Sequence, residues 1–300
     1  MMTLGVDTSN YTTSVALSND YNKVILDLRR PLKVPGGSIG LRQSDAYYQH
    51  IQNLSQMLDE ISKYAMDIEK IVISTKPRNL KNSYMPVFNA GVFFVKAMNF
   101  NNQYEIIELS HQEGHILSGW CEYFNDADEF YLFHISGGTT ELLKVKKTND
   151  RLKSQIVFES LDISFGQLLD RVGNYMNLDF PAGMYLDKIA DRYIKTNLKI
   201  SVTEKGFNLS GMENKFKYIY DETNDSKYVA NLIFSYIVEI IKMISCRFVS
   251  TQPLLIVGGV GESRFLRKNI VECNVIFAKK GLSSDNAVGL SQYPFIMGEI

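Results

Sequence analysis

The chain has 300 residues, 45% of them hydrophobic and 12% aromatic, which is enough for a substantial core in one large or two medium domains. Its 32 basic and 33 acidic residues nearly balance, so overall charge alone does not direct it to nucleic acid. Cys121, Cys246 and Cys273 are scattered and contain no C-x-x-C pair. They argue against a disulfide framework or a cysteine zinc site and predict reduced thiols in a cytoplasm.

Two segments bear on membrane character. The start, "MMTLGVDTSN", has neither the basic nor the apolar region of a signal peptide. The most apolar stretch, residues 228–248, is interrupted by Ser235, Glu239 and Lys242, so it predicts a buried helix and not a span. The sequence therefore predicts a soluble, cytoplasmic protein with no membrane partner.

In chain order, the first half predicts three strands, a helix, a strand, a helix, a strand and a final helix that carries two histidines. The residue ranges are 3–9, 12–18 and 23–32, then 45–65, 70–75, 87–99, 104–109 and 109–119. The second half begins in the same way, with strands over 129–138, 139–147 and 155–161. A helical insertion is expected over about 164–227.

The second half continues with parallel strands over 253–260 and 274–280, separated by a helix that begins near Ser263. A last helix is expected after "SSDNAVGLS", residues 283–291. One topology therefore occurs twice, and each copy opens with a strand-turn-strand whose turn holds small hydroxyl residues: "DTSNYTTSVAL" and "ISGGTTELL". Two such halves create a cleft in which paired turns can hold the phosphates of a nucleotide. The predicted halves are residues 1–124 and 125–300.

The segment "LSHQEGHILSG" contains two of the four histidines. Positions four apart share one helix face, so His111 and His115 can offer two imidazole nitrogens to one cation. A peptide-cutting zinc helix has its general-base Glu directly after the first His, where this chain has Gln112. Glu113 lies about 200° round the helix and should point away from a metal. Two histidines that merely cap or pack remain the alternative.

Other candidate residues can also be explained by structural roles that involve no ligand. Asp285 precedes a helix, where a carboxylate caps the helix or acts as a third hard metal ligand. Asp170 alone reads as a solvated helix residue. His134, on a strand, reads as a hydrogen-bonded structural residue, and the spacing of His50 assigns it no role. In "VGGVGESRFLR" the glycines let a base and ribose approach the backbone closely.

Seven motifs, in order along nearly the whole chain, resemble the actin-like tRNA threonylcarbamoyladenosine transferases of the TsaD/Gcp type, a glycoprotease-like family. The histidine segment is similar to the family's H-x-E-G-H metal helix and "ISGGTTELL" to its S-G-G-[HN]-T turn. The other five are "LGVDTSNYTTSVAL", "FGQLLDRVGNYMNLDFPAGMYLDKIA", "FNLSGMENKF", "VGGVGESRFLR" and "SSDNAVGL". The resemblance implies an α/β fold of two duplicated actin-like (ASKHA, ribonuclease H-like) halves flanking a nucleotide cleft.

The resemblance also implies a site. One divalent metal ion, iron or zinc, would be held by His111, His115 and Asp285. An adenylate would be held by Ile135, Ser136, Gly137, Gly138, Thr139, Asp170, Gly183, Asp187 and Ser263. The opening phosphate turn would consist of Asp7, Thr8, Ser9 and Asn10.

The implied reaction is transfer of the threonylcarbamoyl group from threonylcarbamoyl-adenylate to the exocyclic amine of the anticodon-adjacent adenosine in tRNA. The implied ligands are tRNA and threonylcarbamoyl-adenylate or AMP/ATP. The implied protein partners are a non-catalytic actin-like paralogue and a P-loop ATPase. No residue is identified as the general base.

Several positions depart from the family pattern. They are Tyr11 and Thr12 in place of acids, "KPR" (residues 76–78) in place of a Gly-Pro-Gly turn, Thr139 in place of His or Asn, Glu213 in place of Lys, and Ser263 in place of Asn. These departures keep two alternatives open. One is a non-catalytic or altered-substrate paralogue that acts as a nucleotide-binding scaffold, and the other is a small-molecule carbamoyltransferase or kinase of the actin-like fold.

Overall fold

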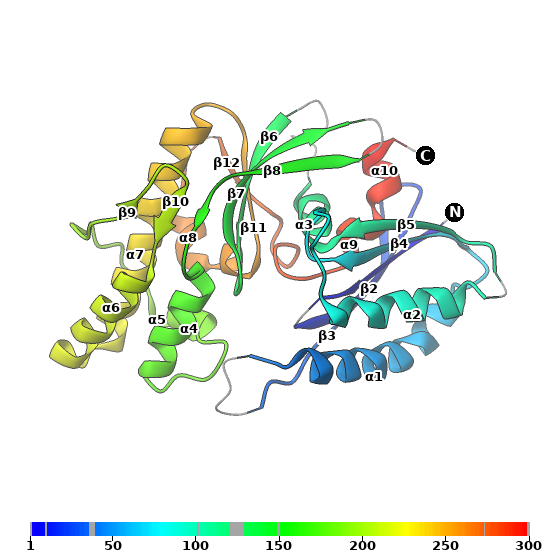
Figure 1. Ribbon diagram of the computed structural model, residues 1–300, viewed down its shortest axis with the longest axis horizontal. Helices are drawn as coiled ribbons and strands as arrows, with labels where there is room; N and C mark the ends of the chain where they lie inside the picture. The colour runs from blue at the N-terminus through cyan, green and yellow to red at the C-terminus, as the bar shows by residue number, and fades with distance from the viewer. Residues whose placement is uncertain are drawn as a thin grey trace.

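The computed structural model describes residues 2–9, 11–35, 40–100, 102–120, 129–148, 151–272 and 274–298. Over these residues the chain forms two mixed sheets, of five and seven strands (Figure 1). The predicted boundary at 124/125 lies outside the described residues, as do Asn10, Cys121 and Cys273.

The first sheet has the order β3-β2-β1-β4-β5. Its strands are β1 (Met2–Thr8), β2 (Thr12–Asn19), β3 (Val24–Pro31), β4 (Ile68–Lys76) and β5 (Glu105–Ser110). The helices of this half are α1 (Gln43–Ser62), the 3₁₀ turn η1 (Pro86–Phe88), α2 (Asn89–Met98) and α3 (His111–Gly119). Buried positions recur along α1 at Ala46, His50, Leu54, Met57 and Ile61, the spacing that keeps one helix face against a core.

The second sheet has the order β12-β11-β6-β7-β8-β10-β9. Its strands are β6 (Glu129–Ile135), β7 (Thr140–Lys147), β8 (Leu152–Ser160), β9 (Ser201–Val202), β10 (Gly206–Asn208), β11 (Leu254–Val257) and β12 (Val275–Phe277). The helices are α4 (Phe165–Tyr175), α5 (Gly183–Ile189), α6 (Ser210–Thr223), α7 (Ser226–Ile244), η3 (Ser245–Val249), η4 (Gly259–Glu262), α8 (Arg264–Asn269), α9 (Val288–Ser291) and α10 (Tyr293–Met297).

The two sheets repeat one topology. In the first, β1 and β3 flank β2 antiparallel, while β4 pairs parallel with β1 and β5 with β4. In the second, β6 and β8 flank β7 antiparallel, while β11 pairs parallel with β6 and β12 with β11. The predicted duplication is confirmed, and β9 and β10 extend only the second copy.

One expectation needs correction. The segment 164–227 is not wholly helical, because β9 and β10 lie within it and β10 pairs with β8. The last helix expected after residue 291 is α10, Tyr293–Met297, and the short helix α9, Val288–Ser291, precedes it without having been predicted.

Helices α3 and α9 lie between the two sheets, whereas α1 and α2 cover the opposite face of the first sheet (Figure 1). A Cβ on Gly289 of α9 would come within 2.2 Å of the Ser118 amide nitrogen in α3, so the two helices meet backbone to backbone. The segment leading into α9 also packs on β1, where a Cβ on Gly5 would come within 2.3 Å of the Ala287 carbonyl oxygen. Helix α3 of the first copy and helix α9 of the second therefore form the junction between the sheets.

One helical stretch, Ser226–Val249, is long and apolar enough to cross a membrane by length and composition. However, 78% of its most apolar window is buried inside the fold. It belongs to the largest hydrophobic cluster, together with Phe165, Phe207 and Phe265. As the sequence predicted, this stretch is a core helix.

Candidate functional site

Helix α3 starts directly after β5, and its first turn is capped from both sides. The Ser110 hydroxyl accepts from the Glu113 amide at 3.2 Å, and Glu113 Oε2 accepts from the Ser110 amide at 2.8 Å. Such a capping box fixes where the helix begins. Glu113 is 1% exposed and its second oxygen lies 3.2 Å from Arg151 Nε, so its carboxylate serves the helix end and not the histidine pair.

One group that fits a metal ion occurs among the described residues: His111, His115 and Asp285. One ligand atom from each lies within 4.8 Å of the others. Asp285 Oδ1 is 3.3 Å from His115 Nε2 and 3.5 Å from His111 Nε2. The alternative of Asp285 as a helix cap is not realised, because α9 begins after Ala287 without a side-chain cap.

The first strand and its turn surround this cluster. Asp7 Oδ1 lies 3.1 Å from His111 Nδ1 and also accepts a hydrogen bond from the Ser74 hydroxyl. The Ser9 hydroxyl donates to Asp285 Oδ2 at 3.2 Å. The Thr8 hydroxyl accepts from the Gly91 amide at 3.2 Å, at the start of α2. The predicted phosphate turn therefore supports the cluster and the neighbouring helix.

Charge and burial set the protonation of the cluster. Burial lowers the pKa of His115, assisted by the neighbouring His111, to about 4. Burial also lowers the pKa of His111, but the carboxylates of Asp7 and Asp285 outweigh it and hold that pKa well above its usual value. Burial raises the pKa of Asp285, yet the neighbouring His111 and His115 hold that pKa well below its usual value. At neutral pH, His115 is neutral and Asp285 ionised, the states in which both bind metals, whereas His111 is protonated and would release a proton on binding one.

The donor set fits a divalent transition metal. Two imidazole nitrogens and one carboxylate are a common protein ligand set for zinc or ferrous iron, with one or more positions left open. His115 Nε2 is buried and makes no hydrogen bond to any described residue. An electron pair held in this way is available to a cation.

The two remaining histidines lie close by. The His134 ring centroid is 4.6 Å from that of His115, and neither His134 nitrogen makes a hydrogen bond within the described chain. The expectation that His134 is a hydrogen-bonded structural residue is therefore wrong. His50 Nδ1 lies 2.8 Å from the Thr13 hydroxyl oxygen, and burial lowers the pKa of His50.

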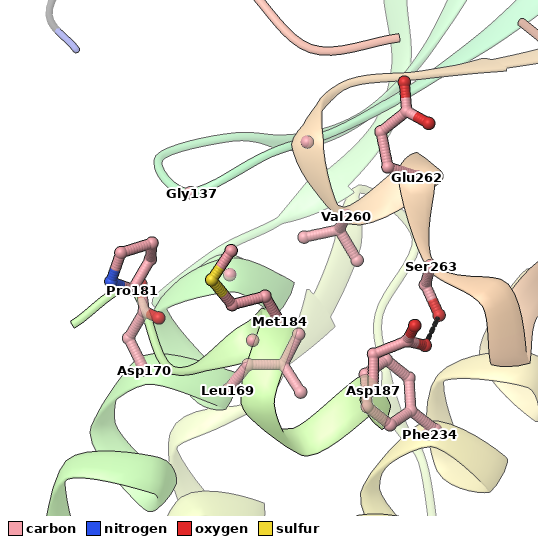
Figure 2. Close-up of a pocket in the computed structure, with 13 residues that line it drawn as sticks. Gly137, Leu169, Asp170, Pro181, Met184, Asp187, Phe234, Val260, Glu262 and Ser263 are labelled. Atoms are coloured by element: carbon pink, nitrogen blue, oxygen red, sulfur yellow. Dashed lines mark hydrogen bonds between the residues drawn. The ribbon is translucent and has the colours of Figure 1, made fainter. Parts of the chain in front are cut away.

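A cavity of about 310 Å³ adjoins the end of β6 (Figure 2). The residues lining it all belong to the second half: Gly137, Gly166, Leu169, Asp170, Pro181, Gly183, Met184, Asp187, Phe234, Gly259, Val260, Glu262 and Ser263. Five of the nine predicted adenylate residues are among them. The exceptions are Ile135, Ser136, Gly138 and Thr139, and no described residue of the first half's turn lines the cavity.

The acidic residues of this cavity already hold its walls together. Asp187 accepts hydrogen bonds from the Ser263 hydroxyl and from the amides of Arg264 and Phe265, both at 3.0 Å, which ties α5 to the start of α8 (Figure 2). Asp170 accepts from the Ala182 amide at 2.8 Å. Met184 and Glu262 were missed as lining residues, although both lie within or beside motifs that the sequence singled out.

The turn after β6 offers free backbone donors. Within the described chain, the amides of Gly137 and Gly138 make no hydrogen bond, and a Cβ on either glycine would meet no atom within 4 Å. Ser136 holds the turn closed, because its hydroxyl accepts from the Thr139 amide at 3.2 Å. Two unengaged amides beside a cavity are typical of an anion-binding turn.

The residues that differ from the pattern of the family lie in different surroundings. Glu213 pairs with Lys217 at 2.5 Å and Arg171 at 3.2 Å and does not line the cavity. The Tyr11 ring, from the first half, lies 6.2 Å from that of Phe180 in the second. Thr12 is the first residue of β2.

Comparison with solved structures gives the fold. The activator of the 2-hydroxyisocaproyl-CoA dehydratase from Clostridium difficile with bound ADPNP is similar over 100% of this chain and 95% of its own, with 13% identity and a TM-score of 0.56. A ROK family glucokinase from Streptomyces griseus, in complex with glucose and AMPPNP, is similar over 98% and 99% respectively, with 10% identity and a TM-score of 0.51. The predicted actin-like fold is confirmed.

Comparison of sequences gives the family. The protein named tRNA N6-adenosine threonylcarbamoyltransferase in Mycoplasmopsis synoviae (strain 53) is 24% identical, covering 99% of this chain and 98% of that protein. Its namesake in Mycoplasma mobile is 26% identical, with the same coverage. Residues 38–291 match the family model described as "TsaD: tRNA N6-adenosine threonylcarbamoyltransferase". This match spans more than half of the chain, and the chain therefore belongs to the TsaD family.

Proposed function

We propose that this protein transfers the threonylcarbamoyl group of threonylcarbamoyl-adenylate to the exocyclic amine of the anticodon-adjacent adenosine in tRNA. The observation that carries the proposal is the convergence of His111, His115 and Asp285, from both halves, close to a nucleotide-sized cavity. Strand β6 connects the two features, because His134 lies beside the cluster and Gly137 borders the cavity. Family membership supports the same reaction class.

The donor is an activated mixed anhydride, so the protein's main tasks are to position it and to stabilise charge. The free amides of Gly137 and Gly138 would hold the phosphate of the adenylate, whose base and ribose would occupy the cavity beside Asp170, Gly183 and Ser263. A divalent metal ion, iron or zinc, would be held by the two histidines and Asp285, where it would supply Lewis-acid stabilisation of negative charge.

We propose a cytoplasmic location and three kinds of partner: tRNA, a non-catalytic actin-like paralogue and a P-loop ATPase. The formal net charge of −1 supports shared recognition, because this chain has no overall positive charge with which to hold a polyanion alone.

The reaction is tested by nucleoside analysis of tRNA. Cells depleted of this protein should lose threonylcarbamoyladenosine, and the wild-type chain should restore it. The His115→Ala variant should fail to restore it because one ligand of the metal is gone. Unchanged modified nucleoside in depleted cells would contradict the proposal. It would favour the altered-substrate paralogue, for which the departures at Thr139, Glu213 and Ser263 give a reason.

The nucleotide site is tested by titrating AMP into the purified chain. Gly137→Val should weaken AMP binding at least about tenfold, because the new side chain projects toward the cavity while meeting no protein atom within 4 Å at its Cβ. Gly211→Val is the control, since Gly211 also has open space but does not line the cavity. Equal AMP affinity in the wild type and a folded Gly137→Val variant would remove this turn from the site.

A further inference from the structure

Glu141 is a buried carboxylate of the second half whose closest polar partners belong to the first. The residue lies at the start of β7 and is 1% exposed. Its Oε1 accepts a hydrogen bond from Gln112 Nε2 at 2.7 Å. Its Oε2 lies 2.7 Å from Arg78 Nη2. A single side chain thus connects β7 to α3 and to the loop after β4.

Gln112 transmits this connection to the metal helix. It lies between His111 and His115 in the sequence, and its side-chain oxygen accepts from the Ser154 hydroxyl of β8 at 3.0 Å. Both polar ends of the amide are therefore held by the second sheet. Its backbone amide donates to the Pro77 carbonyl at 3.0 Å, next to Arg78. Because the histidines share a helix with Gln112, a shift of this amide would shift both rings relative to Asp285.

Glu141 also faces His134. Its Oε1 lies 3.6 Å from His134 Nδ1, and the His134 ring is tilted 45° against His115 at 4.6 Å. Burial raises the pKa of Glu141, but the nearby His134, Arg78 and Gln112 outweigh it and hold the pKa below its usual value. The carboxylate is therefore ionised, and it aligns both the helix that carries the cluster and the ring that packs against it.

We propose that Glu141 is a positioning residue for the cation site, one that holds the two histidines of the first half against Asp285 of the second. The inference rests on the proposed metal function. Arg78, which completes the contact, lies two residues after the end of β4.

A second ion pair provides a matched control. Glu113 of α3 lies 3.2 Å from Arg151 Nε of the second half. This ion pair therefore also joins the two halves, and Glu113 belongs to the same helix as Gln112. Its carboxylate is 2% exposed and Arg151 34%, against 1% and 33% for Glu141 and Arg78. The Glu113–Arg151 pair is connected to the capping box of α3, and no described histidine takes part in it. If both ion pairs are purely structural, substitution of either glutamate should have a similar effect on cation binding. If Glu141 is a positioning residue, only its substitution should weaken cation binding.

The experiment titrates the metal-stripped full chain with Co²⁺, whose visible absorption reports ligand geometry. Glu141→Gln should weaken Co²⁺ binding by about 10–100-fold and alter the absorption band, because partners that orient metal ligands have effects of that size. Glu113→Gln should bind Co²⁺ within about threefold of wild type. Urea unfolding of the metal-free proteins measures the structural cost of each change separately.

The arginines of the two pairs are more exposed than the glutamates, so their variants test the proposal if Glu141→Gln does not fold. Arg78→Met should weaken Co²⁺ binding relative to Arg151→Met. Wild-type affinity and spectrum in the Glu141 or Arg78 variants, or equal weakening in both pairs, would overturn the positioning role. If the wild-type chain itself binds no Co²⁺, the proposed metal function fails first and this inference fails with it.

Discussion

At the scale of single residues, two ligands of the candidate metal centre, His111 and Asp285, are oriented by hydrogen-bonding neighbours. The Asp7 carboxylate is hydrogen-bonded with His111 Nδ1, so Nε2 is the ring nitrogen that faces Asp285. Ser9 engages the second oxygen of Asp285. A ligand held at its far atom loses little rotamer freedom when a cation binds, so these contacts favour binding without contributing ligands themselves.

The role of Asp285 is tested by Asp285→Asn, which preserves shape but removes the charge. We expect this variant to lose most bound metal, as should His115→Ala, because either change removes one of three ligands. Glu113→Gln should keep its metal, since that side chain caps α3. The metal content of the purified proteins tests whether Asp285 is a ligand. Full metal in both ligand variants, or loss in Glu113→Gln alone, would contradict the assignment.

At the scale of elements, the junction between the sheets depends on a close crossing of α3 and α9. The Ser118 hydroxyl accepts from the Gly289 amide at 3.2 Å and donates to Asn286 Oδ1 at 3.0 Å. Only glycine at position 289 permits this approach, because any Cβ would collide with the backbone of α3. The crossing determines how far Asp285 stands from the histidines.

The crossing is tested by Gly289→Ala. We expect the free energy of unfolding in urea to fall by about 1–3 kcal/mol or more, since the added methyl group overpacks a site without room. Gly211→Ala is the control, because Gly211 begins α6 in open space and alanine favours a helix by up to about 1 kcal/mol. Equal stability of Gly289→Ala and wild type would mean that the helices separate easily.

The sequence predicted those elements whose signals are local. Strands β1, β2 and β4 follow runs of apolar residues, and the histidine spacing predicts α3. Helix α9 was missed because four residues are too few to show a period. The contact between Glu141 and Arg78 could not be predicted, since it joins residues of different halves and no local pattern relates them. Family resemblance supplied Asp285 as the partner of the histidines, which no local pattern indicates.

At the scale of the whole molecule, the proposed cation takes ligands from both halves and therefore opposes their separation. His111 and His115 belong to the first half and Asp285 to the second. A ligand that binds only the closed, folded form stabilises it by mass action. Metal binding and the association of the halves are thus coupled.

This coupling predicts a metal-dependent melting temperature. At a free metal concentration about 100 times the Kd, the folded state should gain about 2.7 kcal/mol, which raises the Tm by several degrees. Thermal melting with and without a chelator measures the difference. The His115→Ala variant should melt at the same temperature in both. An identical shift in that variant would mean that the metal stabilises the protein elsewhere.

The position of α9 has a consequence for how the chain is made. The segment from Ala287 to Ser291 packs on β1 and β2 through Gly5, and hydrogen bonds join Ala287 to Ser14 and Ser291 to Ser18. The first sheet emerges from the ribosome before this segment, although the segment covers one of its faces. Until then the nascent sheet exposes apolar surface, as partly folded chains of this size commonly do. The two halves consequently cannot mature one after the other, and completion of the first waits for the end of the second.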